Sequence, residues 1–127
     1  MSQLTRIFMS SALVASIGLA SACSQKQLSY NHDIRPILEQ NCIECHKPGG
    51  TGYAASGLSM ESYDSLMKGT HYGPVIKPGD ALSSTLILLI TGKADESIRM
   101  PHDHRKPLNS NEIEKFKLWI TQGAKNN

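Results

Sequence analysis

Five residues, Cys42-Ile43-Glu44-Cys45-His46, restrict the possible folds of this 127-residue chain more than any others. The two cysteines stand three residues apart, so they share one side of a helical turn, and a histidine follows directly. Three kinds of chemistry use cysteines at this spacing: a redox disulfide, a zinc site and a covalently attached haem. The rest of the sequence discriminates between them.

The redox disulfide and the zinc site fit this sequence less well than the haem. A thioredoxin-like C-x-x-C lies beside a βαβ unit, and no segment shows the alternating pattern of a strand. A zinc site needs four nitrogen or sulfur ligands. Cys42 and Cys45 with two of His46, His102 and His104 could supply them, but structural zinc sites usually space their ligand pairs differently.

The motif C-x-x-C-H is the attachment sequence of c-type haem. On one helical turn the thiols of Cys42 and Cys45 can reach the two vinyl groups at one porphyrin edge. The next residue, His46, then places its imidazole beneath the iron as the proximal ligand. Because the motif occurs once, we expect a single covalent haem c.

The beginning of the chain has the pattern of an export signal. Residues 1–6 carry one basic side chain and no acid, residues 7–20 are almost wholly apolar or small, and Ala20-Ser21-Ala22 follows. This pattern is typical of a secretory signal peptide. We therefore expect residues 1–22 to be a signal peptide, residues 23–29 a polar tether and residues 30–127 the folded domain.

Cys23 is left over if Cys42 and Cys45 are used together, because the chain has three cysteines. Small residues before Cys23 resemble the lipobox of bacterial lipoproteins, although Ala20 stands where that motif usually has leucine. We expect a lipid on Cys23, which would anchor the protein at the periplasmic face of a bacterial membrane. Cleavage by the ordinary leader peptidase and a soluble periplasmic protein are the alternative.

The domain is predicted to be all-α, small and loop-rich, with about four short helices. The first is capped by Asn31 or Asp33, tolerates Pro36 in its first turn and runs into Cys42; the second begins at Ser59 and covers residues 61–67 before Gly69. The third is capped by Ser83 or Ser84, covers residues 86–90 and ends at Gly92. The last begins at Asn109, which with Glu112 resembles a capping box, and ends at Gly123.

The remaining segments are expected to be irregular. Gly49, Gly50 and Gly52 should break regular structure after the motif, and residues 70–80 and 93–107 should form long loops. One tryptophan and two phenylalanines make a thin core, so a large apolar cofactor would be needed to complete it.

The second axial ligand of the haem has several candidates. Met100 is favoured, because it lies in the second long loop and Pro101 restricts its backbone to extended conformations. His102 and His104 follow closely and are rivals. Met60, Met67 and His71 are better explained as core or surface residues.

These features together resemble the single-haem planctomycete-type cytochrome c domain, a class I cytochrome c-like family. The resemblance runs from about Tyr30 to Ala124. It rests on the segments YNHDIRPILEQNCIECH, GLSMESYDSLMKG, GPVIKPGDALSSTLI, RMP and LNSNEIEKFKLWITQGA. The family usually has a second proline after Met-Pro, where this chain has His102.

The resemblance implies a cytochrome-c-like fold wrapped around the haem, with thioethers on Cys42 and Cys45 and iron ligands at His46 and Met100. It also implies that the motif helix and the last helix cross beside the haem. Leu58, residues 73–80 and residues 86–90 would wall the pocket, and Trp119 would be a core residue behind the haem.

The expected function is one-electron transfer between redox partner proteins outside the cytoplasm, with no catalysis by the chain itself. A haem-based gas or redox sensor with a labile distal ligand is the alternative. The net charge is only +2 and no basic stripe is present, so nucleic acid is not an expected partner. A monomer is favoured.

Overall fold

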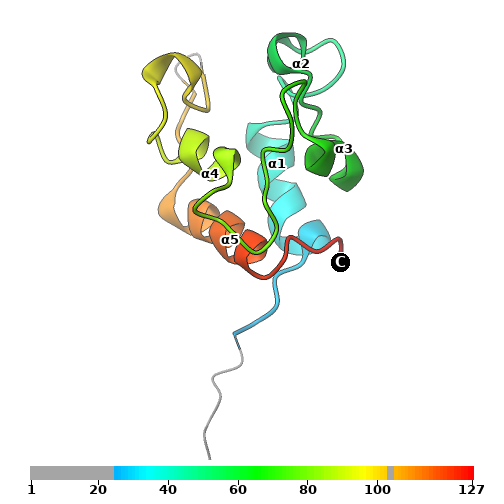
Figure 1. Ribbon diagram of the computed structural model, residues 1–127, viewed down its shortest axis with the longest axis vertical. Helices are drawn as coiled ribbons and strands as arrows, with labels where there is room; N and C mark the ends of the chain where they lie inside the picture. Colours follow the sequence, from blue (N-terminus) through cyan, green and yellow to red (C-terminus); the bar gives the residue numbers. More distant parts are fainter. Residues whose placement is uncertain (1–24, 103–104) are drawn as a thin grey trace, which may run out of the picture.

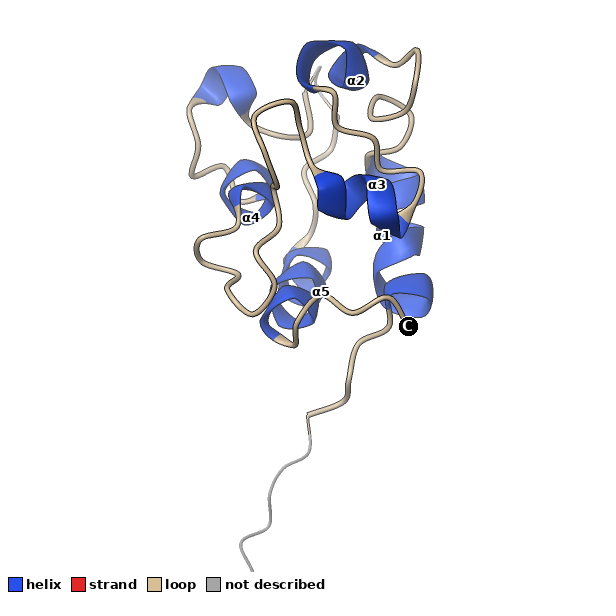
Figure 2. Ribbon diagram, turned by 45° about the vertical axis from the view of Figure 1, so that its right-hand side comes forward, coloured by secondary structure: helices blue, strands red, loops and turns tan. Residues whose placement is uncertain are grey.

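The computed structural model describes residues 25–102 and 105–127 of the chain. Within these ranges it contains helices and loops and no strand, which confirms the all-α class (Figures 1 and 2). The elements are a π-helical turn at Tyr30–Ile34, α1 (Arg35–Asn41), α2 (Thr51–Ser56), α3 (Tyr63–Lys68), α4 (Thr85–Ile90), a 3-10 turn at Glu96–Ile98 and α5 (Ser110–Thr121).

The first helical segment begins earlier than the sequence predicted. Ser29, rather than Asn31 or Asp33, caps it: the Ser29 side chain accepts a hydrogen bond from the His32 amide. The Asp33 carboxylate in turn accepts one from the Ser29 amide at 2.9 Å, so two amides at the start of the segment have partners. Pro36 lies in the first turn of α1, as expected, and Cys42 directly follows the helix.

Gly49 and Gly50 lie in turns after the motif, as predicted, but Gly52 lies inside α2 (Thr51–Ser56), so the prediction was wrong for Gly52. A helix of six residues, such as α2, is too short to be stable in isolation. It forms because the Tyr53 amide donates to the Cys45 carbonyl at 2.9 Å, which ties it to the motif. Gly57, with a φ of +74°, ends it.

The next two helices lie close to their predicted positions. Ser62, not Ser59, caps α3, and Ser65 completes a capping box with it. Ser84 precedes α4 but does not cap it through its side chain. Its hydroxyl instead accepts from the Lys77 amide and donates to the Asp80 carbonyl, at 2.9 and 2.8 Å, and so fixes the loop before α4.

The predicted capping box of α5 is confirmed. The Asn109 side chain accepts from the Glu112 amide at 3.0 Å, and the Glu112 carboxylate accepts from the Asn109 amide at 2.8 Å. α5 buries Phe116, Trp119 and Ile120. It packs against α4 and against the π-helical turn that begins the motif-bearing segment.

Trp119 lies in an aromatic cluster and is fully buried. Its ring centroid is 5.8 Å from that of Tyr30 and 6.5 Å from that of Tyr63. Its indole N–H donates to the Lys125 carbonyl at 2.9 Å. Trp119 is therefore a core residue, as predicted.

The helices form two groups, α4 on one side and α1 with α3 on the other, and α5 connects the two groups at one end (Figures 1 and 2). Long loops make up most of the chain between these helices. In the described ranges, none of the helices has both the length and the apolar character needed to cross a bilayer.

Candidate haem site

A cavity of about 710 Å³ lies between the two sides of the fold. This volume is within the range of pockets that take cofactors, about 300–1,000 Å³. Its wall includes Cys42, Cys45, His46, Met100 and His102. Most of the remaining wall is apolar, and it includes the predicted positions Leu58, Gly73, Pro74, Val75, Leu86, Leu89 and Ile90.

The end of α1 places the three motif residues on one tight turn. The amides of Cys42 and Ile43 both donate to the Leu38 carbonyl at 2.9 Å. The amides of Cys45 and His46 then donate to the Cys42 carbonyl at 3.2 and 3.0 Å. Cys42 and Cys45 are free thiols, and both line the same cavity as His46.

The imidazole of His46 is buried, and its Nδ1 atom has no hydrogen-bond partner. Burial lowers the pKa of this ring; the Leu58 backbone opposes the shift, and His102 adds slightly to it. His46 is therefore neutral at pH 7, which is the form that binds metals.

The environment of Cys42 argues against a redox disulfide. Burial of the thiol raises its pKa to about 12, and the charges of Cys45 and Glu112 add to this effect. A thiol with so high a pKa stays protonated at neutral pH, whereas exchange with disulfides needs the thiolate.

Met100 reaches the cavity from the other side of the fold. Its amide donates to the Leu89 carbonyl of α4 at 3.2 Å, and its side chain packs against the core. Met60 also lines the cavity, but its amide donates to the His46 carbonyl at 2.8 Å. Its backbone therefore lies beside the proximal histidine, while that of Met100 lies against α4.

The other candidates are placed differently. His102 is exposed and lines the cavity. Met67 packs against the core, and His71 is exposed; neither is among the residues of the cavity wall. His104 and Cys23 lie outside the described residues. Within the described part of the chain, no three His, Cys, Asp or Glu side chains are grouped to hold a metal ion together.

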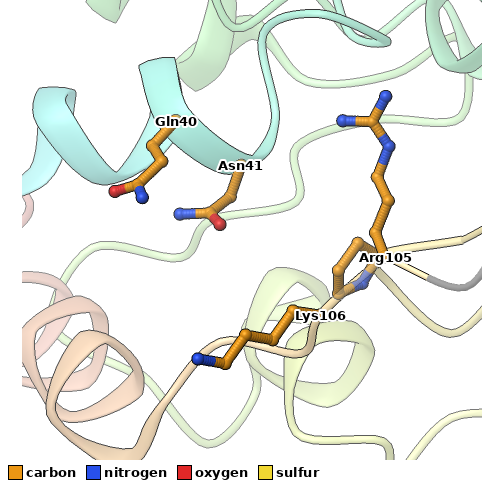
Figure 3. A pocket seen from close by; sticks show the side chains of 5 residues that line it. Gln40, Asn41, Arg105 and Lys106 are labelled. Atoms are coloured by element: carbon orange, nitrogen blue, oxygen red, sulfur yellow. The ribbon is translucent and has the colours of Figure 1, made fainter.

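A smaller pocket of about 250 Å³ adjoins the cavity. Gln40 and Asn41 face it from α1, and Arg105 and Lys106 face it from the segment before α5 (Figure 3). The Arg105 guanidinium also forms an ion pair with Glu44 of the motif, at 2.8 Å. This ion pair joins Arg105 to the motif.

The residues of the cavity fit a haem. Two free thiols at the C-x-x-C spacing line the cavity together with a buried imidazole. A buried, neutral imidazole in the wall of such a cavity is suited to bind a metal ion. A thioether from a distant segment lines the same cavity.

Comparison with known families agrees with this geometry. Residues 42–104 match the family model described as Planctomycete cytochrome C. The chain carries a planctomycete cytochrome c domain. The match covers the CIECH motif and Met100 and is shorter than the resemblance from Tyr30 to Ala124. No curated protein and no solved structure matches the chain.

A cytochrome c domain over residues 42–104 indicates a c-type cytochrome, a class of haem proteins that carry electrons rather than act as enzymes. The sequence did not reveal three features of the cytochrome c domain: the contact of Gly52 with His46, Met60 in the cavity wall and the Arg105–Glu44 ion pair. Each depends on how the chain folds around the motif, which no sequence pattern indicates.

Proposed function

We propose that this protein is an exported one-electron carrier with a single haem c. Thioether bonds to Cys42 and Cys45 would hold the haem, and His46 and Met100 would be its axial ligands. One observation carries the proposal: these four side chains, from segments more than fifty residues apart, line one largely apolar cavity.

The chain's own residues account for a carrier function. The bound haem iron would supply the one-electron chemistry. His46 is held neutral by burial and needs no proton release to bind metal. Met100 offers a soft thioether, and methionine ligation raises the reduction potential relative to a second histidine. Retaining both ligands in both redox states would keep rearrangement small.

Redox partner proteins would approach the mouth of this cavity. Tyr72 and Ile98 both line the cavity and are exposed, at 93% and 51% of their surface. An electron carrier needs no pocket for a substrate, since its partner only has to come near the haem edge. The small net charge of +2 provides little long-range steering.

We place the protein outside the cytoplasm, anchored by a lipid on Cys23. The support is the signal-like pattern of residues 1–22 and the cysteine at its end. Mass spectrometry of the mature N-terminus would test this. A diacylated Cys23 supports the anchor, and an unmodified N-terminus at Cys23 contradicts it while leaving export in place.

The proposed ligands are tested by spectroscopy of protein produced with haem-attachment machinery. Wild type should show low-spin haem with a near-infrared methionine-to-iron band, and Met100→Ala should lose that band. Met67→Ala is the matched control, because Met67 packs against the core without lining the cavity. An unchanged Met100→Ala spectrum would contradict methionine ligation.

A haem-based sensor is the second candidate, and one observation favours it. His102 lines the same cavity only two residues after Met100, so a competing ligand is available. Carbon monoxide should leave the spectrum of the reduced wild type unchanged if the site is closed. Ready binding of carbon monoxide would instead support a labile distal ligand and a sensor.

A further inference from the structure

The first turn of α2 lies against the ring of His46, and Gly52 makes the contact. A methyl group built on Gly52 would stand 2.8, 2.9 and 3.0 Å from Cε1, Nε2 and Nδ1 of the imidazole. Ordinary contacts of this kind are about 3.5–4.0 Å. The three distances are nearly equal, so the methyl would stand over the face of the ring rather than at its edge.

Main-chain hydrogen bonds hold α2 in this position. The Tyr53 amide of α2 donates to the Cys45 carbonyl at 2.9 Å. The Met60 amide, just beyond the helix, donates to the His46 carbonyl at 2.8 Å. The backbone of Gly50 also abuts the Cys45 carbonyl. Because both ends of this segment are tied to the motif, α2 cannot retreat from the ring without breaking these bonds.

The backbone conformation does not explain glycine at position 52. Gly52 is helical and has no positive φ, unlike Gly49 and Gly57. Glycine inside a helix lowers helix stability by about 0.5–1 kcal/mol relative to alanine. The backbone conformation at position 52 does not require glycine, so another reason for it is needed. The close approach of the imidazole is the remaining reason for a residue without a side chain.

We propose that Gly52 is a positioning residue for His46. The bare backbone of α2 supports one face of the imidazole and sets the orientation of the ring plane when His46 is the axial ligand. This inference rests on the proposed haem-binding function of the site. The proposal also gives a function to α2, a helix that buries no side chain.

The test compares Gly52→Ala with Gly49→Ala in the haem-loaded, oxidised protein. Gly49 has a φ of +87°, and a methyl group added there would meet nothing within 4 Å, so its substitution strains the same segment without touching the ring. Paramagnetic NMR shifts of the haem methyl groups depend on the orientation of the axial imidazole. Gly52→Ala should change their pattern and shift the reduction potential, while Gly49→Ala should lower stability and keep the pattern.

A second measurement decides the matter if Gly52→Ala does not fold. In the reduced wild type, nuclear Overhauser contacts are expected between the Gly52 α-protons and the His46 ring protons. Their absence, or an unchanged methyl pattern in Gly52→Ala, would overturn the positioning role. A wild-type protein without a histidine-ligated haem would instead overturn the proposed function, so the two failures are distinguishable.

Discussion

Among the described residues, His46 and Ser84 are buried polar side chains with different hydrogen bonding. The Ser84 hydroxyl makes two hydrogen bonds, to the Lys77 amide and the Asp80 carbonyl. The Nδ1 atom of His46 makes none. A buried hydroxyl with two partners fixes the loop that it joins, so Ser84 has a structural role, whereas His46 lines the cavity.

At the residue scale, we predict that Ser84→Ala lowers the free energy of unfolding by about 1–3 kcal/mol, because it leaves two backbone groups unpaired. The haem spectrum should not change, since Ser84 is not in the cavity wall. Denaturant unfolding and the visible spectrum measure the two effects. Ser110→Ala is the control, because Ser110 is an exposed serine outside this loop. Equal losses in both variants would contradict this account.

Single residues were predictable from the sequence where a local rule applied to them. Spacing alone identifies Cys42, Cys45 and His46 as a group, and the proline that follows Met100 distinguishes this methionine from its rivals. Gly52 and Met60 could not be recognised in this way. Their roles depend on which segments fold back onto the motif. No sequence pattern near Gly52 or Met60 indicates that their segment does so.

At the element scale, the helices with strong caps were the most predictable. Asn109 and Glu112 satisfy each other's backbone amides, and this reciprocal pattern is visible in the sequence. α2 was not predictable because tertiary hydrogen bonds to the motif, rather than its own residues, stabilise it. The first helical segment was displaced by the cap at Ser29, four residues ahead of Asp33.

We predict that Asn109→Ala destabilises the domain by about 1 kcal/mol, the usual cost of losing a helix cap. The effect should reach the whole fold, because α5 buries Phe116, Trp119 and Ile120. Thermal unfolding of the haem-loaded protein would measure it. Asn111→Ala removes a similar exposed side chain from the first turn without removing the cap. A loss in Asn111→Ala as large as in Asn109→Ala would argue against capping.

The loop before α4 should give the protein an acid-sensitive stability. Hydrogen bonds from Lys77 and from Ser83 lower the pKa of Asp80 to about 2. A carboxyl group whose pKa is depressed on folding stabilises the fold above its unfolded pKa, near 3.8, and this contribution is lost as the pH falls toward 2. Asp80→Asn should therefore be less stable than wild type at pH 7, and the difference should vanish near pH 2.

Urea unfolding midpoints across this pH range would measure the effect of Asp80→Asn. Glu61→Gln, which neutralises an exposed carboxylate outside this loop, is the control. A stability difference between wild type and Asp80→Asn that persists unchanged at pH 2 would show that the carboxylate charge is not responsible.

At the scale of the whole molecule, the fold consists of short helices and long loops that surround a cavity. The all-α class was predictable, because no segment has strand periodicity. The approach of the loop containing Met100 to the motif was not predictable from periodicity, and only the resemblance to the cytochrome family implied it. The haem would complete the core by filling about 710 Å³ of largely apolar space.

We predict that the double substitution Cys42→Ser and Cys45→Ser lowers the thermal unfolding temperature and increases proteolysis of the domain. Without thioether bonds the haem can dissociate, and the apolar wall of the cavity becomes exposed. Circular dichroism during heating and limited proteolysis would measure the change. Cys23→Ser is the control, because it removes a cysteine outside the family match. Equal stability of the double variant and wild type would contradict a structural role of the haem.

The most direct test of the central claim is a potentiometric titration of the purified wild-type protein, followed through its visible spectrum, with the haem content measured per chain. The account predicts one haem per chain and one reversible one-electron transition between two low-spin states. A protein without covalently bound haem, or a reduction that releases an axial ligand and gives a high-spin form, would contradict a closed electron carrier.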